Sequence, residues 1–354
     1  MAKQDIEKLD PNLSSKVAGD GLRWIDIRQL AIDGRGWTDT AHPFDRFPAR
    51  AEKIVPPAVW TLSQHTAGMA VRFATAAVKI AVRWTLRNDG LSMHHMPATG
   101  MSGLDLYYRD GAEWKWTANG IPCGLETNQT LLEGLEPAGI RDYLLYLPLY
   151  NGVESAAIGI PEDAVLAEPS PWPGKPICFY GTSITQGGCS NRPGTCYTAI
   201  AARRLNRPHY NFGFSGSGRM EPEVIGLLAE LDPSVYVLDA FPNMTPESIR
   251  ERIPPCVRLL RRAHPRTPIV VMENVHYTNM NLVKSRRENV EQKADAMHEA
   301  LAILHDEGVT RLTLVPGDIL LGGDLEGTVD GCHPTDLGFM RMAEAVIPFL
   351  KPLV

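Results

Sequence analysis

A proline-rich segment divides this 354-residue chain into two parts with different hydrophobic periodicities. Residues 168–176 contain four prolines in nine positions, and prolines at that density cannot continue a helix or a central strand. We therefore predict a linker there, with one domain over residues 1–167 and a second over residues 177–354. Two domains also suit the length of the chain, which exceeds what one hydrophobic core of ordinary size accommodates.

The first part has the pattern of a β-rich domain. In residues 78–84 apolar side chains stand at every second position, which is typical of a strand with one buried face. Residues 71–73 and 142–150 follow a similar pattern. Turn signals lie between such segments, at Asn88-Asp89-Gly90, Arg109-Asp110-Gly111, Asn119-Gly120 and Asn151-Gly152. Many short strands separated by turns predict a β-sandwich of the jelly-roll type.

Strands and helices alternate in the second part. Short apolar segments predict strands at residues 177–180, 210–214, 235–239, 269–273 and 311–315. Apolar stripes at helical spacing lie between them, formed by Ile249, Ile253, Val257 and Leu260 and by Val290, Ala294, Met297, Leu301 and Leu304. This alternation predicts a parallel sheet with helices on both faces, whose working site lies beyond the carboxyl ends of the strands.

A serine follows the first of these strands after a short glycine-containing turn. Residues 177–187 read Ile-Cys-Phe-Tyr-Gly-Thr-Ser-Ile-Thr-Gln-Gly, so Ser183 lies where a nucleophile is exposed and held rigidly. Gly181 before it and Gly187 after it permit a tight turn and a close approach of backbone to a ligand. A turn or helix-capping serine is the alternative. The surroundings favour a nucleophile, and the backbone N–H of Ser183 or of its neighbour could then donate to a developing oxyanion.

The next two strand ends also carry groups that could donate hydrogen bonds. Residues 211–218 contain three glycines, and an uncrowded glycine N–H can point at a substrate oxygen. Asn243 follows the third strand; it either caps the next helix or donates from its amide to the same oxyanion. One such donor is typically worth about 3–4 kcal/mol in the transition state. Donors at successive strand ends favour an oxyanion hole over a set of ordinary loops.

A carboxylate and an imidazole stand three positions apart near the C-terminus, in Asp330-Gly331-Cys332-His333-Pro334. A serine hydroxyl is a weak nucleophile, so it needs a base, and that base needs an orienting partner. Asp330 can accept from one ring nitrogen of His333 and leave the other nitrogen to take the serine proton. His276, which also follows a strand, is the rival base, but it lacks a short-range carboxylate on the right side. The sequence therefore predicts catalytic Ser183, Asp330 and His333.

Composition narrows the partners and cofactors. A net charge of −6 leaves no basic excess for a phosphate backbone, so no nucleic-acid partner is expected. No apolar run approaches the ~20 residues of a membrane span, and no membrane partner is expected. The six cysteines show no paired C-x-x-C spacing, which argues against a zinc site, and we expect no metal and no organic cofactor. The charged N-terminus lacks an apolar signal core, which predicts a cytoplasmic location.

Taken together, these blocks resemble the SGNH (GDSL-like) hydrolase superfamily, whose name records a Ser, a Gly, an Asn and a His. The matching positions are Ser183, Gly216, Asn243 and His333, with Asp330 three residues before the histidine. The resemblance spans roughly residues 175–354. It implies a flavodoxin-like three-layer α/β/α domain, ester hydrolysis, and an oxyanion hole made by the Ser183 N–H, the Gly216 N–H and the Asn243 side chain.

Two blocks depart from the superfamily pattern and point to one branch of it. Gly181-Thr182-Ser183-Ile184 stands where Gly-Asp-Ser-Leu is expected, and Pro242-Asn243-Met244 where Gly-x-Asn-Asp is usual. In that branch the first block continues into Arg192-Pro193-Gly194, and an N-terminal β-sandwich carries a Gly-x-Asp-Leu-Tyr signature, matched here by Gly103-Leu104-Asp105-Leu106-Tyr107.

The resemblance predicts a serine esterase that removes short acyl groups, acetyl above all, from a carbohydrate. The expected partner is a small-molecule or oligosaccharide ester, and a homo-oligomer is possible. The predicted substrate contacts are Arg192, His95, Met96 and Thr182. The alternatives are a lipase or thioesterase with the same Ser, His and Asp, and a carbohydrate-binding protein in which the sandwich is the binder and the hydrolase domain is inactive.

Overall fold

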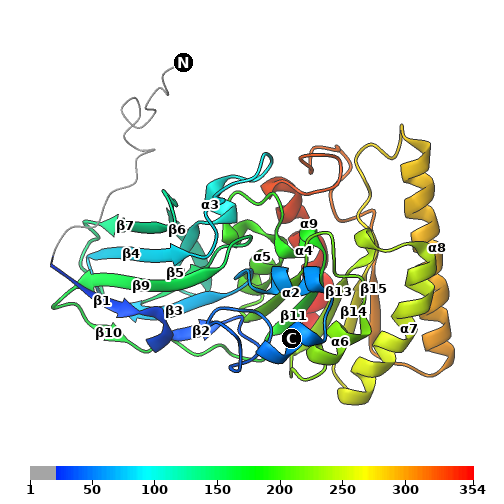
Figure 1. Ribbon diagram of the computed structural model, residues 1–354, viewed down its shortest axis with the longest axis horizontal. Coiled ribbons are helices and arrows are strands. Elements are labelled where there is room, and N and C mark those ends of the chain that lie inside the picture. Colours follow the sequence, from blue (N-terminus) through cyan, green and yellow to red (C-terminus); the bar gives the residue numbers. More distant parts are fainter. Residues whose placement is uncertain (1–20) are drawn as a thin grey trace.

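Two antiparallel sheets form the β-rich part of the molecule (Figure 1). The computed structural model describes residues 21–354; the charged N-terminus, and with it the start of the predicted first domain, lies outside the described residues. One sheet has the order β1 (Leu22–Asp26), β9 (Val153–Pro161), β4 (Lys79–Leu86) and β7 (Glu126–Glu133). The other has the order β10 (Leu166–Ala167), β3 (Ala70–Thr75), β8 (Arg141–Tyr146), β5 (Leu104–Asp110) and β6 (Glu113–Gly120), and β2 (Ala31–Asp33) pairs with β3.

Alternation along each strand builds the core between these two sheets. On β4, Val82 and Trp84 are buried in the sandwich, while Arg83 between them is exposed on the outer face. Phe73 of β3 and Tyr143 of β8 stack in the same core with ring centroids 5.2 Å apart. The predicted sandwich is present; its assignment as a jelly roll stays a prediction.

A five-stranded parallel sheet forms the second part. Its order is β12 (His209–Gly213), β11 (Ile177–Gly181), β13 (Val235–Asp239), β14 (Ile269–Met272) and β15 (Leu312–Val315). Numbered within this sheet, the order is 2-1-3-4-5, the flavodoxin-like arrangement. Its switch point lies between β11 and β13, the two strands that precede Ser183 and Asn243.

Helices cover both faces of the parallel sheet, which makes the three layers visible on the right of Figure 1. One face carries α6 (Pro222–Leu228), α7 (Pro246–Ala263) and α8 (Lys284–Asp306), and the other carries α5 (Tyr197–Arg204) and α9 (Asp336–Leu350). The shorter helices are η2 (Ile27–Gln29), η3 (Ala49–Lys53), α2 (Pro57–Ser63), α3 (Ala98–Met101), α4 (Ser183–Gln186), η4 (Pro193–Thr195), η5 (Phe241–Asn243) and η6 (Lys351–Leu353). The predicted α/β/α architecture is confirmed.

Two local expectations differ from the structure. Asn119-Gly120, predicted as a turn, ends strand β6, because Gly120 still pairs with Leu104 of β5 and the chain turns only afterwards. The strand expected to reach residue 150 ends at Tyr146. Pro148 lies just beyond, and a proline has no N–H to donate to a neighbouring strand.

The sandwich packs directly against the parallel-sheet layer. Part of the connection between β2 and β3 lies in the core of that layer, where Trp37 and Phe47 contact Phe212 of β12. The Arg46 guanidinium, buried beside them, donates to the carbonyls of Asn211 and Gly213 at 2.8 Å each. Residues of the first part are thus needed to complete the core of the second.

Two further observations complete the description. All six cysteines are free. Within residues 21–354, the helices are too short or too polar for any of them to cross a membrane.

Candidate active site

Ser183 lies at the junction between the central strand β11 and the short helix α4. It is the first residue of α4, and Thr182 caps that helix by accepting a hydrogen bond from the Ile184 N–H at 3.3 Å. The turn requires glycine at position 181, because a Cβ there would lie 2.1 Å from Thr185 Oγ1 and 2.4 Å from the Asp239 carbonyl oxygen. The serine is therefore held in one position at the carboxyl edge of the sheet, with 8% of its surface exposed.

A continuous chain of hydrogen bonds joins Ser183, His333 and Asp330. Ser183 Oγ lies 2.8 Å from His333 Nε2, and His333 Nδ1 lies 2.7 Å from Asp330 Oδ2. These side chains are 150 positions apart in sequence, and the sheet edge brings them together. With Nδ1 protonated and donating to the carboxylate, Nε2 is free to accept the serine proton.

The loop before α9 holds the Asp330 carboxylate in its ionised form. Its Oδ1 accepts from the backbone N–H groups of His333 at 2.8 Å and Cys332 at 3.0 Å. Partial burial pushes the pKa of Asp330 up, but the hydrogen bonds from His333 and Cys332 outweigh it, so the pKa lies below its ordinary value. The carboxylate therefore stays charged at neutral pH and can stabilise an imidazolium.

The loop after β12 carries Gly216 to the same edge. The Phe214 N–H donates to the Gly181 carbonyl at 3.0 Å, and a Cβ on Gly218 would lie 2.0 Å from that oxygen. Gly216 adopts a φ of +65° and has open space where a Cβ would stand. Among residues 21–354, no hydrogen bond is recorded for the N–H of Gly216 or of Ser183. Both N–H groups are thus available to a substrate.

Asn243 ends η5, after β13, and its amide nitrogen donates to the Ser217 carbonyl. The buried Lys293 of α8 is hydrogen-bonded to this loop: its Nζ donates to the Pro242 carbonyl at 3.1 Å and also to Asn274 Oδ1 at 3.4 Å. Burial lowers the pKa of Lys293 to about 8. The lysine thereby places a hydrogen bond and a positive charge beside the residue that precedes Asn243.

Of the four predicted substrate contacts, His95 presents an exposed side chain beside His333. The ring of His95, on the segment between β4 and α3, has its centroid 6.2 Å from that of His333. Met96 is instead buried in the contact between the two parts of the molecule. Thr182 is fully buried because its hydroxyl caps α4.

Arg192, the fourth predicted contact, connects the two parts of the molecule. Its Nη1 donates to both oxygens of the buried Asp105, at 2.8 and 2.9 Å, and its guanidinium lies over the Trp116 ring at 4.5 Å. Asp105 also accepts from the Gly194 N–H at 2.9 Å and from Trp116 Nε1 at 2.7 Å. The two sequence signatures around Asp105 and Arg192 therefore form one contact.

Two residues beside the site were not predicted from the sequence. Tyr150 donates from its hydroxyl to the Ser183 carbonyl at 3.2 Å, across from the end of the sandwich. Lys293 interrupts the apolar stripe of α8 between Val290 and Met297, and a lysine at such a position is a signal for a buried functional cation. The rival base His276 has no recorded hydrogen bond within the described part of the chain; it lines a small cavity with Tyr277.

Comparisons with known proteins agree with this arrangement. Residues 174–351 match the model of the GDSL-like Lipase/Acylhydrolase family, and residues 22–166 match that of the N-terminus of Esterase_SGNH_hydro-type proteins. A search of curated proteins finds no match to the chain.

Among solved structures, a protein from Bacteroides ovatus assigned to the GDSL-like lipases is 33% identical, with a TM-score of 0.89 over 94% of this chain and 98% of the other. Two more distant structures share the fold. A salicylyl-acyltransferase from a tetracycline biosynthetic pathway has 19% identity and a TM-score of 0.76, covering 95% and 100% of the two chains. An acetyl xylan esterase from the rumen bacterium Butyrivibrio proteoclasticus has 12% identity and a TM-score of 0.60, covering 94% and 98%.

Proposed function

The chain belongs to the GDSL-like lipase/acylhydrolase family, and from this we propose that it is a serine esterase acting through Ser183, His333 and Asp330. The observation that carries the proposal is the unbroken chain from Ser183 Oγ through both ring nitrogens of His333 to the Asp330 carboxylate. This arrangement activates a hydroxyl for nucleophilic attack without a metal or cofactor.

In the first half of the reaction, Ser183 Oγ attacks the carbonyl carbon of the ester while His333 Nε2 takes the hydroxyl proton. Asp330, accepting from Nδ1–H, holds the ring and stabilises the imidazolium that forms. The tetrahedral intermediate collapses, the bond to the alcohol breaks, and the imidazolium gives its proton to the departing oxygen. An acyl group remains on Ser183.

Water completes the cycle. His333 Nε2 takes a proton from a water molecule, which attacks the acyl carbon; the second tetrahedral intermediate then releases the carboxylic acid, and the proton returns to Ser183 Oγ. In both halves, the negative charge on the former carbonyl oxygen is held by the Ser183 N–H, the Gly216 N–H and the Asn243 amide. The two backbone donors are unoccupied, which supports this role.

For the substrate, we infer a short acyl ester, acetyl above all, on a carbohydrate. The acetyl xylan esterase among the structural relatives supports this only as a shared fold. His95, beside His333, is the contact that we assign to the alcohol part of the substrate.

The test is the hydrolysis of p-nitrophenyl acetate by matched pairs of variants. Ser183→Ala lowers kcat by about 10⁴-fold or more, whereas Ser190→Ala, whose buried hydroxyl has no hydrogen-bond partner, leaves it nearly unchanged. His333→Ala inactivates and His276→Ala does not. Retained turnover in Ser183→Ala would refute the mechanism.

The substrate class is tested separately with p-nitrophenyl esters of increasing chain length and with acetylated xylo-oligosaccharides, following acetate release. We expect the acetyl ester to be hydrolysed with the highest kcat/KM of the series. A preference for octanoate would favour the lipase or thioesterase alternative.

A further inference from the structure

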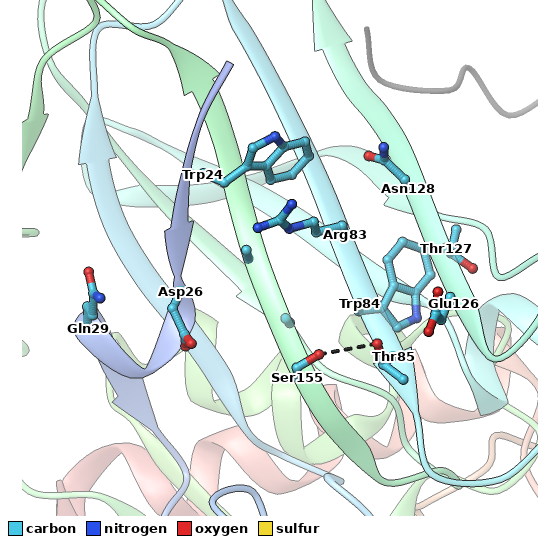
Figure 2. A pocket seen from close by; sticks show the side chains of 12 residues that line it. Trp24, Asp26, Gln29, Arg83, Trp84, Thr85, Glu126, Thr127, Asn128 and Ser155 are labelled. Atoms are coloured by element: carbon cyan, nitrogen blue, oxygen red, sulfur yellow. Dashed lines mark hydrogen bonds between the residues drawn. The ribbon is translucent and has the colours of Figure 1, made fainter. Parts of the chain in front are cut away.

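A groove with a volume of about 670 Å³ crosses the outer face of the four-stranded sheet (Figure 2). Small residues of the second strand, β9, form its floor, where Ser155 and Ala157 face outward. Larger side chains rise on both sides, from β1 and η2 on one side and from β4 and β7 on the other. Sites for small ligands are concave and typically measure roughly 300–1,000 Å³, so this groove has the size of a binding site.

The strand register sets the polar side chains opposite each other. Ala157 pairs with Asp26 on one neighbour and with Arg83 on the other, and Arg83 in turn pairs with Asn128. In the next row, Ser155 pairs with Thr85, and their hydroxyls are hydrogen-bonded at 3.2 Å. The Asp26 carboxylate, the Arg83 guanidinium and the Asn128 amide therefore form one row across the groove, on rigid strands.

Trp24 closes one end of the groove. Its indole lies over Gly159, where a Cβ would come within 2.9 Å of the ring, so glycine lets the indole lie close to the sheet. The Arg83 guanidinium lies over the same ring, 4.6 Å from its centroid. This cation–π contact orders the guanidinium and keeps it at the groove without a carboxylate partner.

Several of the polar groups that line the groove are uncommitted. Within residues 21–354 no hydrogen bond or ion pair is recorded for the side chains of Gln29, Arg83, Glu126 and Asn128. The Asp26 carboxylate, by contrast, is neutralised by Arg28 at 2.5 Å. One uncompensated cation and one uncompensated anion therefore face the groove, together with two amides. The charges balance, and donors and acceptors are both present.

From these observations we propose that the groove is a binding site for a neutral oligosaccharide. Carboxylate, amide and guanidinium groups on fixed strands match the hydroxyls of a sugar, which both donate and accept. A nucleic acid would require a surplus of positive charge, which the groove lacks. A lipid tail would require an apolar lining throughout, whereas a carboxylate, a guanidinium, amides and hydroxyls lie along this groove. The inference does not depend on the catalytic assignment, because no residue that lines the groove belongs to the Ser183 site.

The experiment is titration calorimetry on the full chain carrying Ser183→Ala, with xylohexaose, cellohexaose, mannohexaose and, as an anionic probe, a hexamer of galacturonic acid. We expect at least one neutral hexasaccharide to bind with a millimolar or tighter Kd. Adding Trp24→Ala or Arg83→Ala weakens that binding about tenfold or more. Adding Arg23→Ala, the same change on β1 outside the groove, leaves it unchanged.

The same groove and control substitutions in the otherwise unaltered chain leave hydrolysis of p-nitrophenyl acetate within about twofold, since changes outside a catalytic site move such constants little. Arg83 is exposed and unpaired, so its variant remains informative if loss of Trp24 disturbs the sheet. Three results would overturn the proposal: no neutral hexasaccharide binds at millimolar concentration, the Trp24 and Arg83 variants both bind as tightly as their parent, or the anionic hexamer binds more tightly than every neutral one.

Discussion

The contact between Asp105 and Arg192 should contribute strongly to the stability of the whole chain. Asp105 belongs to the sandwich, is fully buried, and accepts from Arg192, Gly194 and Trp116. Beyond it, Thr195 Oγ1 and the Asn191 N–H donate to Asp336, the first residue of α9, which follows His333. Asp105→Ala removes the acceptor at the centre of this network.

The size of the effect follows from what the substitution leaves behind. Removing one member of a buried ion pair costs about 3–5 kcal/mol, because the remaining charge keeps its desolvation penalty. Arg192 is 24% exposed, so water relieves part of its penalty. The buried Gly194 N–H also loses its acceptor, at about 1–3 kcal/mol, and this loss offsets the relief at Arg192. Trp116 is 48% exposed, so its indole N–H can donate to water instead. We therefore expect Asp105→Ala to lower the free energy of unfolding by about 3–5 kcal/mol.

The assay is urea denaturation followed by tryptophan fluorescence and by activity, on Asp105→Ala, Arg192→Ala and the double variant. The double variant should be less destabilised than the sum of the single changes, with a coupling of about 1.5–3 kcal/mol for a charged hydrogen bond. Activity and fluorescence should be lost together. A loss below about 1 kcal/mol in Asp105→Ala, or additive single changes, would refute the reasoning.

Two further predictions concern buried titratable groups. Lys293→Met lowers kcat for p-nitrophenyl acetate about tenfold or more with little change in KM, because the loop before Asn243 loses a donor and a charge; an unchanged kcat in steady-state kinetics would contradict this. Burial raises the pKa of Asp239 from 3.8 to about 7, so the folded state binds the extra proton between these values and stability falls as pH rises through that window. In Asp239→Asn, the decrease in the free energy of unfolding between pH 5 and pH 8 should be smaller than in the unaltered chain by more than about 1 kcal/mol, as measured by urea denaturation. An identical pH dependence in the variant and the unaltered chain would count against this explanation.

Local patterns in the sequence were sufficient for the architecture of the second part. The strand predicted at residues 235–239 matches β13 in both bounds, and the predicted apolar stripe of Ile249, Ile253, Val257 and Leu260 is buried on α7. Ser183 was predictable from its place at a strand end, and His333 from the carboxylate three positions before it; the structure places the two side chains in contact at the sheet edge.

Contacts between distant segments were not predictable. The connection that holds Trp37 and Phe47 looks like part of a sandwich in sequence, yet it packs on β12, because burial there depends on a surface that only the folded sheet provides. Asp105 and Arg192 were both noted in the sequence. Because they lie 87 positions apart, no local pattern indicated that they form an ion pair, and Arg192 was predicted to contact the substrate instead. Met96 and Thr182 were expected to face a ligand, and both are buried.

The central claim is that Ser183 is the nucleophile activated by His333. The most direct measurement is reaction of the native chain with a fluorophosphonate, followed by mass spectrometry of the proteolytic peptides. We predict a single adduct on Ser183 that no longer forms in His333→Ala. An adduct on another serine, or labelling that persists when His333 is replaced, would contradict the account.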